Sequence, residues 1–232
     1  MFSLNPSLRS YSWGSKTLIA DLRGEESPTQ HPQAELWYGA HPAAPADIAG
    51  VPLTDIIAAD PDRELGAEVR ARFGDRLPFL LKILAVAEPL SLQAHPSLAQ
   101  AQEGFRRENA QGIDVRAGNR NYRDDNHKPE LIVALTPFHA MAGFRPLAET
   151  LELFAALDCP SLARYVGMID STGEEAVNLR MLFTTWITIP AAVRKQLIDD
   201  IIVAAKRVVA EGSAAEWQRE TLVNIIELDA HY

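Results

Sequence analysis

The chain changes character near residue 146, and this change limits the folds that are open to it. Before this point, short apolar runs of strand length are separated by Pro, Gly, Asp or Asn, whereas after it apolar residues recur with the period of an α-helix. No amphipathic helix follows each apolar run in the first part, so an antiparallel sandwich or barrel is favoured over a doubly wound sheet. We therefore predict an α+β protein with a β domain at residues 1–146 and a mostly helical subdomain at residues 147–232.

One helix interrupts the predicted strands of the first part. Ser97 and Gln100 have the spacing of a capping box at the start of a helix, and Gly112 offers a stop signal at its end. The five predicted strands are ELWYGAH (35–41), LPFLLKILAV (77–86), LSLQAH (90–95), ELIVAL (130–135) and FHAMAGF (138–144).

The second part contains three predicted helices. They cover residues 147–158, 187–212 and 214–229, and the middle one has Pro190 near its start and Gly212 at its end. None of the three carries a cluster of convergent polar groups, so we interpret them as packing elements. Their expected core-facing residues are Val193, Leu197, Ile201, Ala205, Val208, Leu222, Ile225 and Ile226.

Charge and cysteine content exclude several classes of protein. The 22 basic and 31 acidic side chains give a net charge of −9, which disfavours binding to nucleic acid or to an anionic membrane surface. The single cysteine, Cys159, has no partner for a disulfide or a thiolate zinc cluster. Without a signal sequence or a run of about 20 apolar residues, we expect a cytoplasmic protein.

The segment LSLQAH places three polar side chains on one face of a predicted strand. Because side chains alternate along a strand, Ser91, Gln93 and His95 point to the same side. An ordinary half-buried strand with this face in solvent has the same pattern. The pattern therefore indicates chemistry only if a second segment supplies further polar groups.

The segment HKPEL can supply them, since Lys128 and Glu130 also share a strand face. Together with Gln93 and His95, the Glu130 carboxylate makes three donors of a tetrahedral zinc site that keeps one position open. With only one anionic ligand, the ion would keep much of its Lewis acidity. The alternative is that Glu130 simply pairs with Lys128 or with a nearby arginine.

Lys82 interrupts the apolar run FLLKILAV, which is otherwise typical of a fully buried strand. A buried ammonium group needs a partner. If Lys82 faces the same cavity as Ser91, the two could hold an anion such as a phosphate group. Alternatively, Lys82 reaches solvent at the rim of the sheet or pairs with an acid.

Taken together, these segments closely resemble the type I phosphomannose isomerases, a family of zinc-dependent cupins. The resemblance covers the first 145 residues in the family's order. It implies an antiparallel, cupin-like (jelly-roll) β domain, with the helical stretch lying between two β halves. The matching segments are YSWGSK (11–16), AELWYGAHP (34–42), LPFLLKILAVAEPLSLQAHPS (77–97), GFRRENAQGI (104–113) and NYRDDNHKPELIVALTPFHAMAGFR (121–145).

The resemblance implies a reaction and a set of roles. The reaction is the interconversion of mannose 6-phosphate and fructose 6-phosphate through a cis-enediol stabilised by zinc. Gln93, His95 and Glu130 match three of four zinc ligands, while Trp13, Lys82 and Ser91 match substrate-binding positions. Lys128 matches an active-site lysine, and the adjacent His127 is a second candidate for proton transfer, which we rank below it because its side chain should alternate to the other face.

The sequence departs from the family at its C-terminal end. Family members continue into further strands that bring the fourth ligand, a histidine, whereas this chain ends at ELDAHY, about where that second β half should begin. His31 and His41 each precede a proline and are expected in loops rather than at the metal. We expect an N-terminal portion of the family's fold, monomeric, with weak zinc retention and little or no turnover by itself.

Three other functions stay open at this point. The chain could be a cupin-like module that binds metal or sugar phosphate without catalysis. It could be another metal-dependent cupin enzyme, such as an iron oxygenase, although those sites favour two histidines and a carboxylate, and Gln93 argues for zinc. An interaction scaffold built on the acidic helical half has only composition in its favour.

Overall fold

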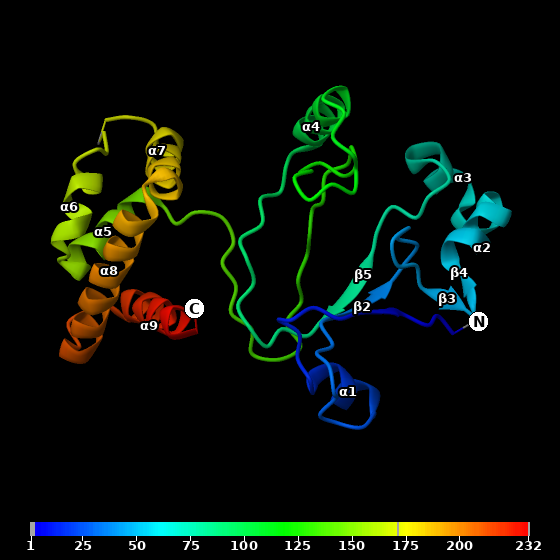
Figure 1. Cartoon of the computed structure of the whole chain (residues 1–232), viewed down its shortest axis with the longest axis horizontal. Coiled ribbons are helices and arrows are strands. Elements are labelled where there is room, and N and C mark those ends of the chain that lie inside the picture. Colours follow the sequence, from blue (N-terminus) through cyan, green and yellow to red (C-terminus); the bar gives the residue numbers. More distant parts are fainter. Residues whose placement is uncertain (1–2, 171, 232) are drawn as a thin grey trace. The chain divides into compact units, whose positions relative to one another are not determined.

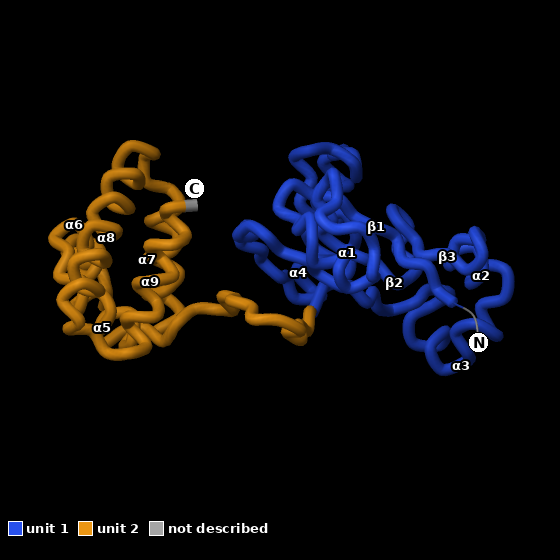
Figure 2. The backbone as a smooth tube through the Cα atoms, turned by 90° about the horizontal axis from the view of Figure 1, so that it is seen from below, with its two compact units in different colours: residues 1–129 blue, residues 130–232 orange. Residues whose placement is uncertain are grey.

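The computed structural model describes residues 3–170 and 172–231 (Figure 1). The chain is an α+β protein with small antiparallel sheets and many helices. It forms two compact units, Met1–Pro129 and Glu130–Tyr232, which Figure 2 draws in blue and orange. The sequence placed the boundary between its two parts at residue 146, which is the residue before the first helix of the second unit.

A three-stranded antiparallel sheet organises the first unit. Its strands are β1 (Ser7–Arg9), β2 (Glu35–Tyr38) and β5 (Leu81–Leu84), in the order β1-β2-β5. On one face, Leu36 of β2 packs with Ile19 and Ala85 into a small buried core. On the other face, the register aligns Ser7, Trp37 and Lys82 across the three strands. One face of this sheet is thus apolar, and the other carries polar and aromatic groups.

The remaining elements of the first unit are short. The capping box predicted for the helix after Ser97 is confirmed, because the Ser97 hydroxyl accepts from the backbone N–H of Gln100 and the Gln100 side chain accepts from that of Ser97. Gly66 interrupts helix α3 with a positive φ of 77°. The elements are α1 (Leu18–Arg23), β3 (Asp47–Ile48), β4 (Val51–Pro52), α2 (Leu53–Ala59), α3 (Pro61–Phe73) and α4 (Leu98–Ala110).

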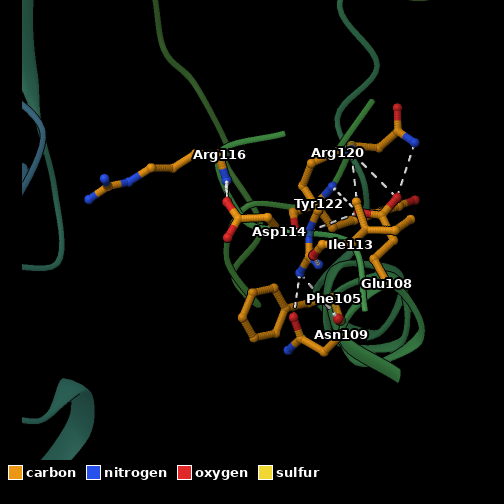
Figure 3. A network of polar contacts seen from close by, with 9 residues as sticks. Phe105, Glu108, Asn109, Ile113, Asp114, Arg116, Arg120 and Tyr122 are labelled. Carbon is orange, nitrogen blue, oxygen red and sulfur yellow. Dashed lines mark hydrogen bonds and ion pairs between the residues drawn. The ribbon is translucent and has the colours of Figure 1, made fainter. Parts of the chain in front are cut away.

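A buried ion pair fixes the loop that follows α4 (Figure 3). Arg120 and Glu108 lie 3.0 Å apart, with side chains 0% and 5% exposed. Arg120 also donates to the Ile113 carbonyl oxygen and to the Asn109 side chain, at 2.7 Å each. The Tyr122 backbone N–H donates to Glu108 and holds the pKa of this carboxyl below its ordinary value. The pair therefore connects α4 to residues 113–122.

Two of the five predicted strands are confirmed in part, and three are wrong. β2 and β5 lie within the predicted runs 35–41 and 77–86, whereas residues 90–95, 130–135 and 138–144 carry no strand and no arrow in Figure 1. The reason is that a strand needs a neighbouring strand for its backbone hydrogen bonds, and none of the strand pairs or isolated bridges of the described residues includes these segments. Their apolar side chains are largely exposed, with Leu92 at 77% and Leu131 at 90%.

The second unit contains five helices among its described residues. The predicted helix 187–212 is in fact interrupted, since α7 ends at Thr188 and α8 begins at Ala191, after Pro190. The predicted end is confirmed, because Gly212 adopts the left-handed conformation with φ 67°. The helices are α5 (Leu147–Leu157), α6 (Pro160–Val166), α7 (Glu175–Thr188), α8 (Ala191–Glu211) and α9 (Glu216–His231).

These helices bury one apolar cluster. It includes Leu197, Ala205 and Val208 of α8 and Leu222 of α9, as their spacing predicts, whereas Val193 is 38% exposed. Ile201 and Ile226 pack against the same cluster. Within the described residues no single helix is long and apolar enough to cross a membrane, and α7 with α8 passes that test only as a pair bent by 114°.

Candidate functional site

The polar face of the β1-β2-β5 sheet surrounds Lys82. Glu35 and Trp37 are 7% and 9% exposed, and the Trp37 indole N–H donates to Glu35 Oε2 at 2.7 Å. Lys82 Nζ lies 3.7 Å from Glu35 Oε1 and 5.0 Å from the centre of the Trp37 ring. The expectation of a fully buried strand is wrong here, because the Lys82 side chain is 35% exposed. Lys82 therefore pairs with an acid while its side chain stays partly exposed.

A row of aromatic and cationic side chains continues from Trp37 to Trp13. The Arg9 guanidinium lies 5.2 Å from the centre of the Trp37 ring and 5.6 Å from that of Tyr11. Tyr11 in turn stacks on Trp13 with the ring centres 5.4 Å apart. Such contacts are favourable because an aromatic face carries partial negative charge. The row therefore links Trp13 with Lys82, two residues that the sequence predicts to bind substrate.

His95 is exposed, and a backbone contact sets the orientation of its ring. Its Nδ1 lies 2.6 Å from the carbonyl oxygen of Lys128. A carbonyl oxygen can only accept, so Nδ1 carries the hydrogen in this contact and the lone pair of neutral His95 is on Nε2. This is the tautomer and the type of outer partner that metal-binding histidines use.

Ser91 and Gln93 lie in the same segment as His95. All three residues are exposed, and the strand that would place them on one face is not formed. Their shared face is therefore not confirmed. Ser91 and Gln93 stay predicted substrate and metal residues.

Lys128 forms an ion pair within the loop that precedes it. Its Nζ lies 2.7 Å from Asp124 Oδ2 and 2.8 Å from Oδ1. Burial by itself raises the pKa of Asp124. Hydrogen bonds from Lys128 and from the Asn126 backbone outweigh this effect, so the pKa lies below its ordinary value. The Lys128 side chain is 54% exposed, and the neighbouring His127 is exposed as well.

Glu130 is exposed and is the first residue of the second unit. Among the described residues, no three His, Cys, Asp or Glu side chains come together as a group that could hold a metal ion. The predicted ligand set has the Gln93 amide in place of one of these side chains. Its amide oxygen, imidazole nitrogen and carboxylate oxygen are donor types that zinc accepts. The orientation of His95 fits this set.

His41 was expected in a loop, and it does lie in the loop after β2. Its ring meets the edge of Trp37 with the centres 4.9 Å apart, and its Nδ1 accepts from the backbone N–H of Ala43 at 3.1 Å. Burial, followed by the positive charge of Lys82, lowers the pKa of His41.

Comparison with known proteins identifies the family. The sequence model described as "Phosphomannose isomerase type I, catalytic domain" matches residues 1–147. The chain belongs to the type I phosphomannose isomerase family. Mannose-6-phosphate isomerase of Escherichia coli (strain K12) is 46% identical over 178 residues, which are 74% of this chain and 45% of that protein. The Schizosaccharomyces pombe protein of the same name is 36% identical over 77% of this chain and 40% of its own length.

Solved phosphomannose isomerase structures share the fold. The Salmonella typhimurium mannose 6-phosphate isomerase bound to substrate (f6p) and zinc matches with a TM-score of 0.78 and 36% identity, covering 97% of this chain and 56% of that one. A mannose 6-phosphate isomerase bound with zinc and yttrium matches with a TM-score of 0.79, also at 36% identity. The chain thus spans about half the length of the relatives it matches.

Sequence reasoning missed several residues of the candidate site. Glu35 and Trp37 belong to the segment ELWYGAH, which was interpreted as a strand and as part of a segment that matches the family, but neither residue was given a role, and neither was Asp124. Their spacing was an available signal. Glu35 and Trp37 are two residues apart, as Gln93 and His95 are, and residues with this spacing share one face of a strand. An acid on the strand beside Lys82 is the partner that a lysine in an apolar run requires.

Proposed function

We propose that this chain carries the substrate-binding face and three zinc ligands of a mannose-6-phosphate isomerase, which interconverts D-mannose 6-phosphate and D-fructose 6-phosphate. The observation that carries the proposal is the contact of His95 Nδ1 with the Lys128 carbonyl oxygen. It joins the predicted metal segment to the predicted catalytic segment and leaves Nε2 for a metal. The family match over residues 1–147 supports the same conclusion.

Gln93, His95 and Glu130 would hold the zinc ion as three of its four ligands. When bound, the ion would supply Lewis acidity to substrate oxygens that gain negative charge. The donor set supports this role, because two neutral ligands and one carboxylate leave the ion with net positive charge.

Lys82 and Ser91 would bind the phosphate group. The partly exposed Lys82 side chain supports this, because its contact with Glu35 is 3.7 Å, longer than a close hydrogen-bonded pair. A phosphate oxygen can therefore approach without breaking a short ion pair. Trp13, at the far end of the aromatic row, would contact the sugar.

Lys128 would assist proton transfer between C1 and C2, where the reaction passes through a cis-enediol. Its ammonium group, held by Asp124, can donate a hydrogen bond to oxygen as charge develops there. His127, beside it, is the second candidate for moving the proton. We rank Lys128 first because its side chain is already oriented by an ion pair.

We also propose that residues 1–146 form a cupin-like jelly-roll domain and residues 147–232 its helical subdomain. The exposed apolar segments 90–95, 130–135 and 138–144 support this, since they have strand composition. Pairing with further strands would bury them.

A metal-binding experiment tests the ligand set. Zinc affinity of the chain is compared by titration with that of His95→Ala and Glu130→Ala, with His31→Ala as the control histidine. We expect weak zinc binding by the unchanged chain and a loss of at least about tenfold in each ligand variant, because each leaves the ion under-coordinated. Equal zinc binding by all four proteins would contradict the assignment.

A second candidate function is binding of zinc and sugar phosphate without turnover. An assay that couples fructose 6-phosphate formation to a reporter, with and without zinc, separates the two functions. We expect little or no turnover by this chain, with binding retained.

A further inference from the structure

His41 lies among charged groups that come from three other segments of the first unit. Lys82 of β5, Arg9 of β1 and both Lys128 and Asp124 of the loop before residue 129 all act on it electrostatically. Two of these groups, Lys82 and Lys128, are predicted to contact opposite ends of the substrate. The His41 ring meets the edge of Trp37, and Lys82 Nζ lies 5.0 Å from the centre of the same Trp37 ring, so His41 and the predicted phosphate-binding lysine share one aromatic neighbour.

The contacts of His41 fix its ring and its tautomer. The edge contact with Trp37 holds the plane of the ring, and Nδ1 is occupied because it accepts from the Ala43 backbone N–H. In the neutral ring the hydrogen must then be on Nε2. Nε2 is a hydrogen-bond donor whose direction is set before any ligand arrives.

Burial and the charges around His41 both favour its neutral form. Burial lowers its pKa most, Lys82, Arg9 and Lys128 lower it further, and only Asp124 acts in the opposite direction. A neutral imidazole at pH 7 presents Nε2–H to an oxygen without competing with the lysines for a counter-ion. It also leaves the Asp124 carboxylate to Lys128.

We propose that His41 is a further substrate-binding residue, which donates a hydrogen bond from Nε2 to an oxygen of the sugar phosphate beside Lys82. This inference rests on the proposed function. It adds a neutral donor to a site in which the other predicted contacts are an indole, a hydroxyl and two ammonium groups. The segment ELWYGAH then contributes to the site through Glu35, Trp37 and His41 rather than only to the sheet.

A titration of the chain with fructose 6-phosphate in the presence of zinc, followed by two-dimensional NMR, tests the inference because it detects weak binding. His41→Phe keeps a ring against Trp37 but removes the donor, whereas His41→Gln keeps an amide donor at similar reach. We expect Kd to rise about tenfold or more in His41→Phe, the cost of losing a hydrogen bond to a charged group, and to be largely restored in His41→Gln. His31→Phe, at a His-Pro pair that has no proposed role in the site, should bind like the unchanged chain.

The outcomes separate the two proposals. Unchanged affinity in His41→Phe, or an equal loss in His41→Phe and His41→Gln, would overturn the donor role while the proposed function stands. No binding by the unchanged chain would overturn the proposed function and the inference with it. The spread of the NMR signals in each variant shows whether the fold is intact.

Discussion

The helices of the second unit and the sheet of the first unit obtain their stability in different ways. Helices α5 to α9 bury a large apolar cluster that extends from Leu153 to Leu222. Among the described residues, the apolar cluster at the sheet of the first unit is small: Ile19, Leu36 and Ala85 are buried, and Tyr38 and Ile83 pack against them. Several apolar neighbours along the chain are exposed. A helix satisfies its backbone within itself, so it needs a partner only for its apolar face, whereas a strand needs a partner for its backbone as well.

The first unit relies on polar contacts where its apolar contacts are few. The Glu108–Arg120 pair is buried, and Glu35 is held by the Trp37 indole and by Lys82. Buried charges are costly unless they are paired, so such groups tolerate change poorly. The comparison therefore predicts that the helical unit is most sensitive to lost volume and the first unit to lost partners.

The largest effect should follow removal of volume from the helical core. Leu222→Ala should lower the free energy of unfolding by about 2–5 kcal/mol, because the side chain is fully buried and a cavity would remain. Leu131→Ala is the matched control, since Leu131 is 90% exposed. It should change the free energy of unfolding by less than about 0.5 kcal/mol. Denaturant unfolding measures both, and equal losses would remove the distinction between the two segments.

The next largest effect should come from the ion pair beside α4. Arg120→Met fills similar space but leaves the Glu108 carboxylate buried without its cation, so the first unit should unfold at clearly lower denaturant concentration. The control is Arg116→Met, because Arg116 is exposed in the same loop. A midpoint for Arg120→Met that equals that of the control would show that the loop does not depend on the pair.

A smaller effect is expected at the start of α4. Ser97→Ala removes the acceptor for the Gln100 backbone N–H and should cost about 1 kcal/mol. Ser97→Asp keeps an acceptor at this position and should recover most of the loss. Unfolding of the three proteins under identical conditions checks this, and a deficit shared by both variants would argue against the cap.

The smallest effect concerns pH. The pKa of Glu108 is lowered in the folded chain from its ordinary value of 4.5, chiefly by the Tyr122 backbone N–H. The stabilisation from the carboxylate is therefore complete above the ordinary value and is lost as the pH falls through the lowered one. In Glu108→Gln, the free energy of unfolding should decrease less steeply with falling pH than in the unchanged chain. Thermal unfolding between about pH 6 and about pH 3 measures the two slopes.

Local signals were sufficient for α4, α5, α8 and α9, whereas α1, α2, α3, α6 and most of α7 were not predicted. The capping box at Ser97 and Gln100, Pro190 and Gly212 each marked a helix boundary that the structure contains or nearly contains. The apolar spacing of α8 and α9 indicated most of the buried cluster. Apolar composition could not separate strand from exposed coil at residues 130–135, because that difference depends on whether another strand pairs with them.

The sequence by itself determined the residue types of the site and its family, since the segments around Lys82, His95 and Lys128 occur in the family's order. Only the tertiary structure decided which groups act on one another: Glu35 and Trp37 on Lys82, the Lys128 carbonyl oxygen on His95, and Lys82 with Arg9 on His41. The physical reason is range. Helix boundaries and strand alternation depend on near neighbours in the chain, whereas hydrogen bonds and charges act through space between segments that only the fold brings together.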